Sequence, residues 1–144
     1  MGNLVVFFGK NKDILKIVAK YKETYQASVY EIETVDNYIG FMKRFSSVFL
    51  GSNIPIKRCN LNLANYQNVI LISPLWFNNV PKPVKRFLEQ QTGKINNIIY
   101  ILYNNNKEDK EKEFDKLDKI INLRRSNSYF VTVNKKDIHV RVYQ

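Results

Sequence analysis

The segment from position 68 to position 88 constrains the fold of this chain more than any other, and it reads NVILISPLWFNNVPKPVKRFL. Its apolar run at residues 69–72 is too short for a helix and has turn-forming residues on both sides, as is typical of a central strand in a parallel sheet. Prolines suited to a first helical turn and an apolar stripe at helical spacing come next. These helix signals are Pro81, Pro83, Val84, Phe87 and Leu88. The segment therefore predicts a buried strand, a loop and a helix in immediate succession.

The loop between this strand and this helix contains the adjacent aromatic residues Trp76 and Phe77. Loops at the carboxyl ends of parallel strands form the binding crevice of open α/β sheets. An aromatic pair at this place offers a flat apolar platform to a ligand. The same position also suits a tryptophan that closes the top of the core, and the sequence leaves both interpretations open.

Strands and helices alternate along most of the chain. Apolar or alternating runs predict strands at residues 4–8, 28–33, 69–72 and 97–103, and helical spacing predicts helices at 14–25, 38–49, 84–92 and 114–121. Such alternation predicts an α/β domain whose parallel sheet is covered on both faces. The end of the chain differs, because residues 129–133 and 138–143 flank a polar turn and predict a fifth strand with a hairpin return.

Composition limits the class of protein. The chain has 144 residues, of which 44% are hydrophobic, which suits one domain spanning residues 1–144. No apolar run approaches the roughly 20 residues that cross a bilayer, so we expect no membrane association. Cys59 is the only cysteine, which favours a cytoplasmic protein without disulfides. The net charge is +10, yet acidic residues balance much of the lysine-rich stretch at 107–119, so nucleic-acid binding is not expected.

Residues 4–133 resemble the flavodoxin family, including its small flavodoxin-like proteins and FMN reductases. The residues that carry the resemblance are Ser73, Pro74, Leu75 and Trp76, then Pro81, Pro83, Phe87 and Leu88, together with the predicted helix at residues 38–49. The resemblance implies a flavodoxin-like three-layer sandwich with a five-stranded parallel sheet in the order 2-1-3-4-5. A C-terminal β-hairpin would stand in place of the family's last helix.

The resemblance also implies an FMN site at the carboxyl edge of the sheet. From the residues themselves we expect no catalytic side chain and no metal. The phosphate would lie at Gly9, Lys10, Asn11, Lys12, Asp13 and Ile14. The isoalloxazine ring would lie against Pro74, Leu75, Trp76, Phe77 and Asn78, with Trp76 as the stacking residue. Its other side would be closed by Asn104, Asn105 and Asn106.

The first of these segments departs from the family pattern, in which hydroxyl side chains and backbone N–H groups at a helix N-terminus hold the phosphate. No hydroxyl is present at residues 9–14. The Asn11 amide can still donate, and Lys10 and Lys12 can neutralise a phosphate. Asp13 supports the opposite interpretation, because a carboxylate in a first helical turn can itself satisfy the exposed N–H groups.

The absence of a last helix predicts apolar surface at the fourth and fifth strands, which either the hairpin or a second copy of the chain would cover. Two functions are consistent with the sequence. The first is an FMN-binding protein in electron transfer or flavin-dependent reduction, an oxidoreductase whose redox partner would carry an acidic surface, because this chain is basic. The alternative is a flavodoxin-fold binding or scaffold module that has lost the flavin.

Overall fold

The computed structural model describes residues 2–35, 55–104, 111–134 and 137–143. The helix predicted at residues 38–49 lies outside the described residues, as do Asn105 and Asn106. The elements are β1 (Gly2–Phe7), α1 (Lys12–Tyr25), β2 (Ser28–Glu31), the 3-10 helix η1 (Leu63–Asn65), β3 (Tyr66–Pro74), α4 (Lys82–Gln90), β4 (Ile98–Tyr103), α5 (Glu111–Ile121), β5 (Asn127–Val133) and β6 (Ile138–Tyr143). None of the helices in these ranges has the length and hydropathy needed to cross a membrane.

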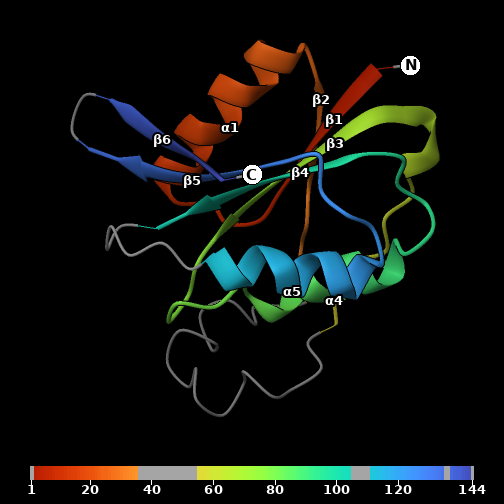
Figure 1. The fold of residues 1–144 in the computed structure, drawn as a ribbon. Coiled ribbons are helices and arrows are strands. Elements are labelled where there is room, and N and C mark those ends of the chain that lie inside the picture. Colours follow the sequence, from red (N-terminus) through yellow and green to blue (C-terminus); the bar gives the residue numbers. More distant parts are fainter. Residues whose placement is uncertain (1, 36–54, 105–110, 135–136, 144) are drawn as a thin grey trace.

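One six-stranded sheet forms the middle layer, in the order β2-β1-β3-β4-β5-β6 (Figure 1). The first five strands in chain order are parallel, which confirms the predicted five-stranded arrangement 2-1-3-4-5. The predicted hairpin return is also confirmed, but it adds a sixth strand to the same sheet. Strand β6 pairs antiparallel with β5 over six residue pairs.

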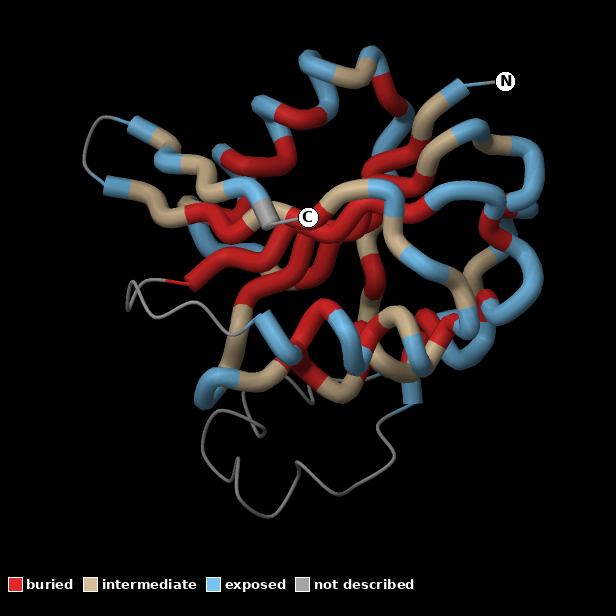
Figure 2. The backbone as a smooth tube through the Cα atoms, viewed as in Figure 1, coloured by how far each residue is buried: buried red, intermediate tan, exposed pale blue. Residues whose placement is uncertain are grey.

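Helices cover both faces of the sheet, as expected for parallel strands that are apolar on both sides. Helix α1 lies on one face, and α4 and α5 lie together on the other (Figure 1). Figure 2 shows the central strands as almost wholly buried between these layers. The α1 face is packed with side chains such as Val5, Ile70 and Ile101, which share one buried cluster with Ile14 and Ile17 of α1.

The β5–β6 hairpin contributes to the cover of the α1 face, where the family's last helix would lie. Ile101 and Val131 are fully buried there, although no helix follows β5 within the described residues. Ile138 and Val140 of β6 pack against the same cluster. The hairpin therefore covers part of this face, as one of the two predicted alternatives required. Cover by a second copy of the chain stays a prediction. A light-scattering mass of one chain at micromolar concentration would count against a homodimer.

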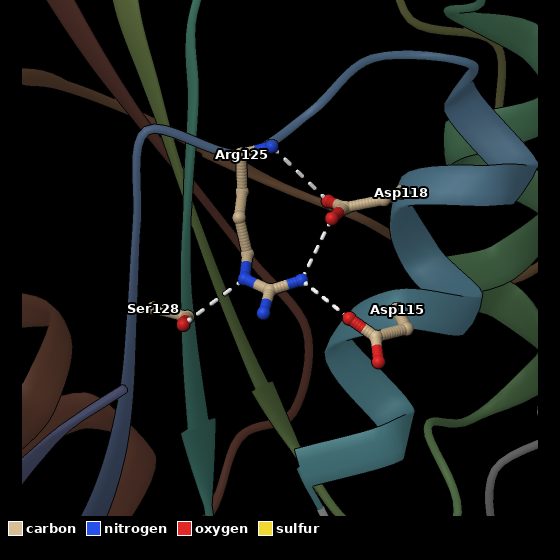
Figure 3. A network of polar contacts seen from close by, with 4 residues as sticks. All are labelled: Asp115, Asp118, Arg125 and Ser128. Carbon is tan, nitrogen blue, oxygen red and sulfur yellow. Dashed lines mark hydrogen bonds and ion pairs between the residues drawn. The ribbon is translucent and has the colours of Figure 1, made fainter. Parts of the chain in front are cut away.

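A network of polar contacts fixes α5 to the start of β5 (Figure 3). The Arg125 guanidinium donates to Asp118 at 2.7 Å and to Asp115 at 3.0 Å. Its Nε donates to the hydroxyl of Ser128 at 3.1 Å, and the guanidinium also lies 5.3 Å from the centre of the Phe114 ring. This network lies at the amino end of β5, away from the predicted ligand edge.

Candidate functional site

The turn from β1 into α1 forms the first part of the predicted site. Gly9 has a φ of +107°, a conformation that side chains disfavour, so a glycine suits this position. Asn11 caps the helix, because its Oδ1 accepts from the Ile14 N–H at 2.7 Å. Lys10 extends toward β2, and its Nζ lies 3.8 Å from Glu31 Oε1. One of the helix N–H groups that a phosphate would use is therefore already bonded to a side chain of the chain itself.

The loop after β3 contains a tight two-residue turn. Trp76 N–H donates to the Asn79 carbonyl at 2.8 Å, and Asn79 N–H donates to the Trp76 carbonyl at 3.0 Å. The two residues at the tip, Phe77 and Asn78, have φ of +53° and +63°. Positive φ at both central residues is the geometry of a type I′ turn, which asparagine adopts readily and phenylalanine does not. The Phe77 backbone is therefore held in a conformation that costs about 1 kcal/mol.

The two aromatic residues of this turn differ in burial. The Trp76 ring lies 5.3 Å from the Phe8 ring, measured between centroids and tilted by 60°, and packs against the core on the α4 and α5 face. Phe77 is 61% exposed at the tip. Trp76 remains partly exposed, so its predicted contact with a flavin ring stays a prediction. The freely presented ring on the loop is that of Phe77.

Two contacts hold the loop after β3 in place. Leu75 N–H donates to the carbonyl of Tyr103, which joins the loop to the end of β4 at 3.0 Å. Val80 N–H points at Glu113 Oε2 of α5, at 3.4 Å. Glu113 is only 4% exposed, and its other oxygen accepts from Lys116 at 2.7 Å. A buried carboxylate therefore anchors the segment that leads from the aromatic turn into α4.

Lys85 of α4 belongs to the same charged group as Glu113. Burial lowers the pKa of Lys85, while the charge of Glu113 acts in the opposite direction and the neighbouring charges of Lys82 and Lys116 lower it further. The anchor at the base of the loop thus combines a buried carboxylate with several cationic side chains around it.

The end of β4 brings the predicted phosphate loop and the predicted ring-closing loop together. The Tyr103 hydroxyl donates to Asp13 Oδ2 at 2.5 Å, across 90 positions of sequence. The next residue, Asn104, is buried, and its N–H donates to the Val131 carbonyl at 3.0 Å. Of the three asparagines predicted to close the site, the structure describes only this first one. Ile14, Pro74 and Asn104 thus all lie at the carboxyl edge, where all three are buried, and their contact with a flavin stays a prediction.

Sequence reasoning missed three residues that shape this edge: Tyr103, Asn79 and Glu113. Tyr103 could have been found, because a tyrosine that ends a buried strand needs a partner for its hydroxyl. Asn79 closes the aromatic turn, and its amide also donates to the Phe77 carbonyl at 2.9 Å. Glu113 gives no signal in the sequence, because it stands among other acidic residues on a charged helix.

The residues at the carboxyl edge of the sheet fit a flat aromatic ligand that carries an anionic tail, with one qualification. Phe77 offers an exposed ring face, the turn offers amide and backbone polar groups, and α1 begins at the same edge with Lys10 and Lys12 beside it. The qualification concerns the tail, because the Asn11 side chain already accepts from a first-turn N–H and Asp13 adds a carboxylate to the same turn.

Solved structures similar to this one were found among flavoproteins. A candidate flavoprotein from Bacteroides eggerthii has a TM-score of 0.74 at 17% identity, covering 94% of this chain and 90% of that one. A second, from Bacteroides uniformis, has a TM-score of 0.75 at 16% identity, covering 94% and 92%. A flavoprotein from Lactobacillus acidophilus, solved in complex with FMN, has a TM-score of 0.69 at 13% identity and covers 91% of each chain.

These similarities extend over nearly the whole of both chains, so the architecture is shared and not only a local motif. At this level of identity they establish the fold, which is flavodoxin-like. No family model matches the sequence, and no curated protein sequence matches it either.

Proposed function

We propose that this protein binds a flavin, with FMN as the first candidate, and that it takes part in electron transfer or flavin-dependent reduction. The observation that carries the proposal is the exposed Phe77 ring at the carboxyl edge of a flavodoxin-like sheet. A structural neighbour that shares this fold holds FMN. A bound flavin would supply the redox chemistry, since its ring accepts hydride or single electrons.

The residues of this chain would bind and orient that ring. The Phe77 side chain would stack on its face, with Trp76 closing the core beneath the loop. Backbone groups of the turn and the end of β4 at Asn104 would contact its polar edge. The start of α1 would receive the tail of the nucleotide, with Lys10 and Lys12 as counter-charges.

The charge of the chain bears on its redox partner. With 23 basic and 13 acidic residues, the protein carries a net charge of +10. Encounter between redox proteins is steered by opposite charge, so the proposed partner has an acidic docking surface. The prediction is an electron-transfer rate that falls as ionic strength rises.

The second candidate function is that of a binding or scaffold module that has lost the flavin, and one observation favours it. The Asn11 side chain already accepts from the Ile14 N–H, and Asp13 adds a carboxylate to the first turn of α1, which is the helix end that would receive a phosphate. A scaffold or binding module with a flavodoxin-like fold would need no phosphate site.

Titration with FMN separates these two candidates. Trp76 is the only tryptophan, so intrinsic fluorescence reports directly on the loop after β3. Binding is expected to quench this fluorescence and to raise the melting temperature, because a ligand that binds only the folded state stabilises it. If FMN at about 1 mM, enough to reveal even weak binding, changes neither signal, the flavin proposal is wrong and the scaffold function remains.

A further inference from the structure

The hydrogen bond between Tyr103 and Asp13 places a fixed negative charge at the phosphate end of the proposed site. Asp13 lies in the first turn of α1, and Tyr103 is the last residue of β4. Their oxygens are 2.5 Å apart. Burial raises the pKa of the Tyr103 hydroxyl, and the bond to Asp13 raises it further, so the hydroxyl keeps its proton and remains a donor. The carboxylate is thereby held at this place.

A carboxylate in the first turn of a helix interacts favourably with the positive end of the helix dipole, as a bound phosphate does. Asn11 meanwhile accepts from the Ile14 N–H at 2.7 Å. Two groups of the chain therefore already provide interactions that a phosphate would provide. The hydroxyl side chains that could add donors are absent from residues 9–14.

The nearby lysine side chains compensate only in part for the negative charge of Asp13. Lys10 lies 3.8 Å from Glu31, so its charge is shared with a carboxylate of β2. Lys12 is exposed to solvent, where its interaction with a phosphate is screened. The phosphate of FMN would thus lie near two lysines, of which Lys10 is already paired with a carboxylate and Lys12 is solvated. It would also lie near the negative charge of Asp13.

We infer that Asp13, positioned by Tyr103, discriminates against the 5′-phosphate of FMN, so that the site recognises the flavin ring and ribityl chain and binds riboflavin about as tightly as FMN. This inference rests on the proposed flavin-binding function. It makes Asp13 a specificity-determining residue and Tyr103 a positioning residue.

The test compares the dissociation constants of FMN and riboflavin for the full chain by isothermal titration calorimetry at low ionic strength. The wild-type protein is expected to bind both ligands with constants within about threefold of each other, or 0.65 kcal/mol. Asp13→Asn removes the charge and is expected to tighten FMN binding about tenfold, or 1.4 kcal/mol, while riboflavin binding stays within about twofold. The gain should shrink as salt is added.

Glu23→Gln is the matched control, because it makes the same charge change on an exposed residue near the other end of α1. It is expected to leave the ratio of the two constants unchanged. Tyr103→Phe releases the carboxylate and is expected to shift the ratio toward FMN by a smaller factor than Asp13→Asn. A change in stability alone would weaken both ligands equally, so the ratio distinguishes positioning from a structural role.

Wild-type binding of FMN more than about tenfold tighter than riboflavin would overturn this inference and leave the flavin-binding function standing. Weaker FMN binding by Asp13→Asn, with riboflavin unchanged, would overturn it as well, because Asp13 would then assist the phosphate. If neither flavin binds, the proposed function itself fails, and the inference fails with it.

Discussion

Arg125 binds Asp118 twice, once through its backbone N–H at 3.2 Å from Oδ1 and once through its guanidinium at 2.7 Å from Oδ2. The Arg125 and Asp118 side chains are 12% and 19% exposed. Burial raises the pKa of Asp118, and the charge and hydrogen bonds of Arg125 lower it again in part. Asp118 therefore holds its carboxyl group in a place that disfavours negative charge, and Arg125 compensates for this in part.

Replacing Arg125 by leucine is expected to destabilise the protein by about 2 kcal/mol at pH 7, because a partly buried carboxylate loses its cation. The penalty should be smaller near pH 3.5. The folded pKa of Asp118 lies above its ordinary value of 3.8 and rises further without Arg125. At pH values between 3.8 and the raised pKa of folded Asp118, the folded state binds more protons than the unfolded state. The free energy of unfolding therefore falls as pH rises through this range. Urea unfolding at the two pH values measures this difference.

Arg124→Leu is the control for this prediction, since Arg124 is the exposed neighbour in sequence. It is expected to change the free energy of unfolding by less than about 0.5 kcal/mol. Adding Asp118→Asn to Arg125→Leu should recover much of the lost stability at pH 7. Equal penalties at both pH values would contradict the electrostatic explanation.

Phe77→Gly is expected to separate stability from ligand binding. Glycine relieves the positive φ of +53° but costs conformational entropy in the unfolded chain, so the melting temperature should change little. Loss of the exposed ring should weaken flavin binding about tenfold. Asn78→Gly makes the same backbone change at the adjacent position with φ of +63° and should keep the affinity. Equal affinities of the two variants would show that Phe77 does not contact the flavin.

Glu113→Ala is expected to loosen the loop after β3. It leaves the buried Val80 N–H without its acceptor, which costs about 1 to 2 kcal/mol. The Trp76 emission spectrum should shift as the loop moves, and flavin affinity should fall. Glu113→Gln keeps an acceptor and should lie between the alanine variant and the wild type. Glu111→Ala, at an exposed position in the same helix, should have little effect on the Trp76 emission. A shift as large as that of Glu113→Ala would show that Glu113 does not anchor the loop.

Val140→Ala is expected to cost about 1 kcal/mol, because Val140 packs against the cluster under α1. Val142→Ala on the same strand should cost less than about 0.5 kcal/mol, because Val142 is 58% exposed. Thermal unfolding of both variants at low protein concentration gives the comparison. Equal costs that grow with protein concentration would instead indicate that a second chain covers Val142.

The fold could be predicted from the sequence wherever hydrophobic periodicity was strong. The run at Val69 to Ile72 had to be a buried strand, and the stripe through Val84 and Phe87 had to face a core. Strand β3 extends beyond that run to Pro74, because its last residues pair with β4 although their types favour a turn. Pairing in the sheet overrode the local preference there.

The site was less predictable, because its geometry depends on tertiary contacts between ordinary residue types. A positive φ at Phe77 is improbable from sequence, and the turn forms because Trp76 and Asn79 pair across it. Asp13 could be assigned to a helix N-terminus, but its bond to Tyr103 joins elements 90 positions apart. No local pattern encodes such a contact.

The antiparallel direction of β6 brings Tyr143 back to the edge of the sheet at which β1 begins. Tyr143 pairs with Ser128 near the start of β5, and Gly2 pairs with Tyr66 at the start of β3. Gly2 and Tyr143 therefore both lie at the amino edge of the sheet, on the side away from Phe77 and Asp13. A surface linker attached beside Gly2 or Tyr143 would leave the carboxyl edge open, so protein immobilised there is suited to flavin-binding measurements.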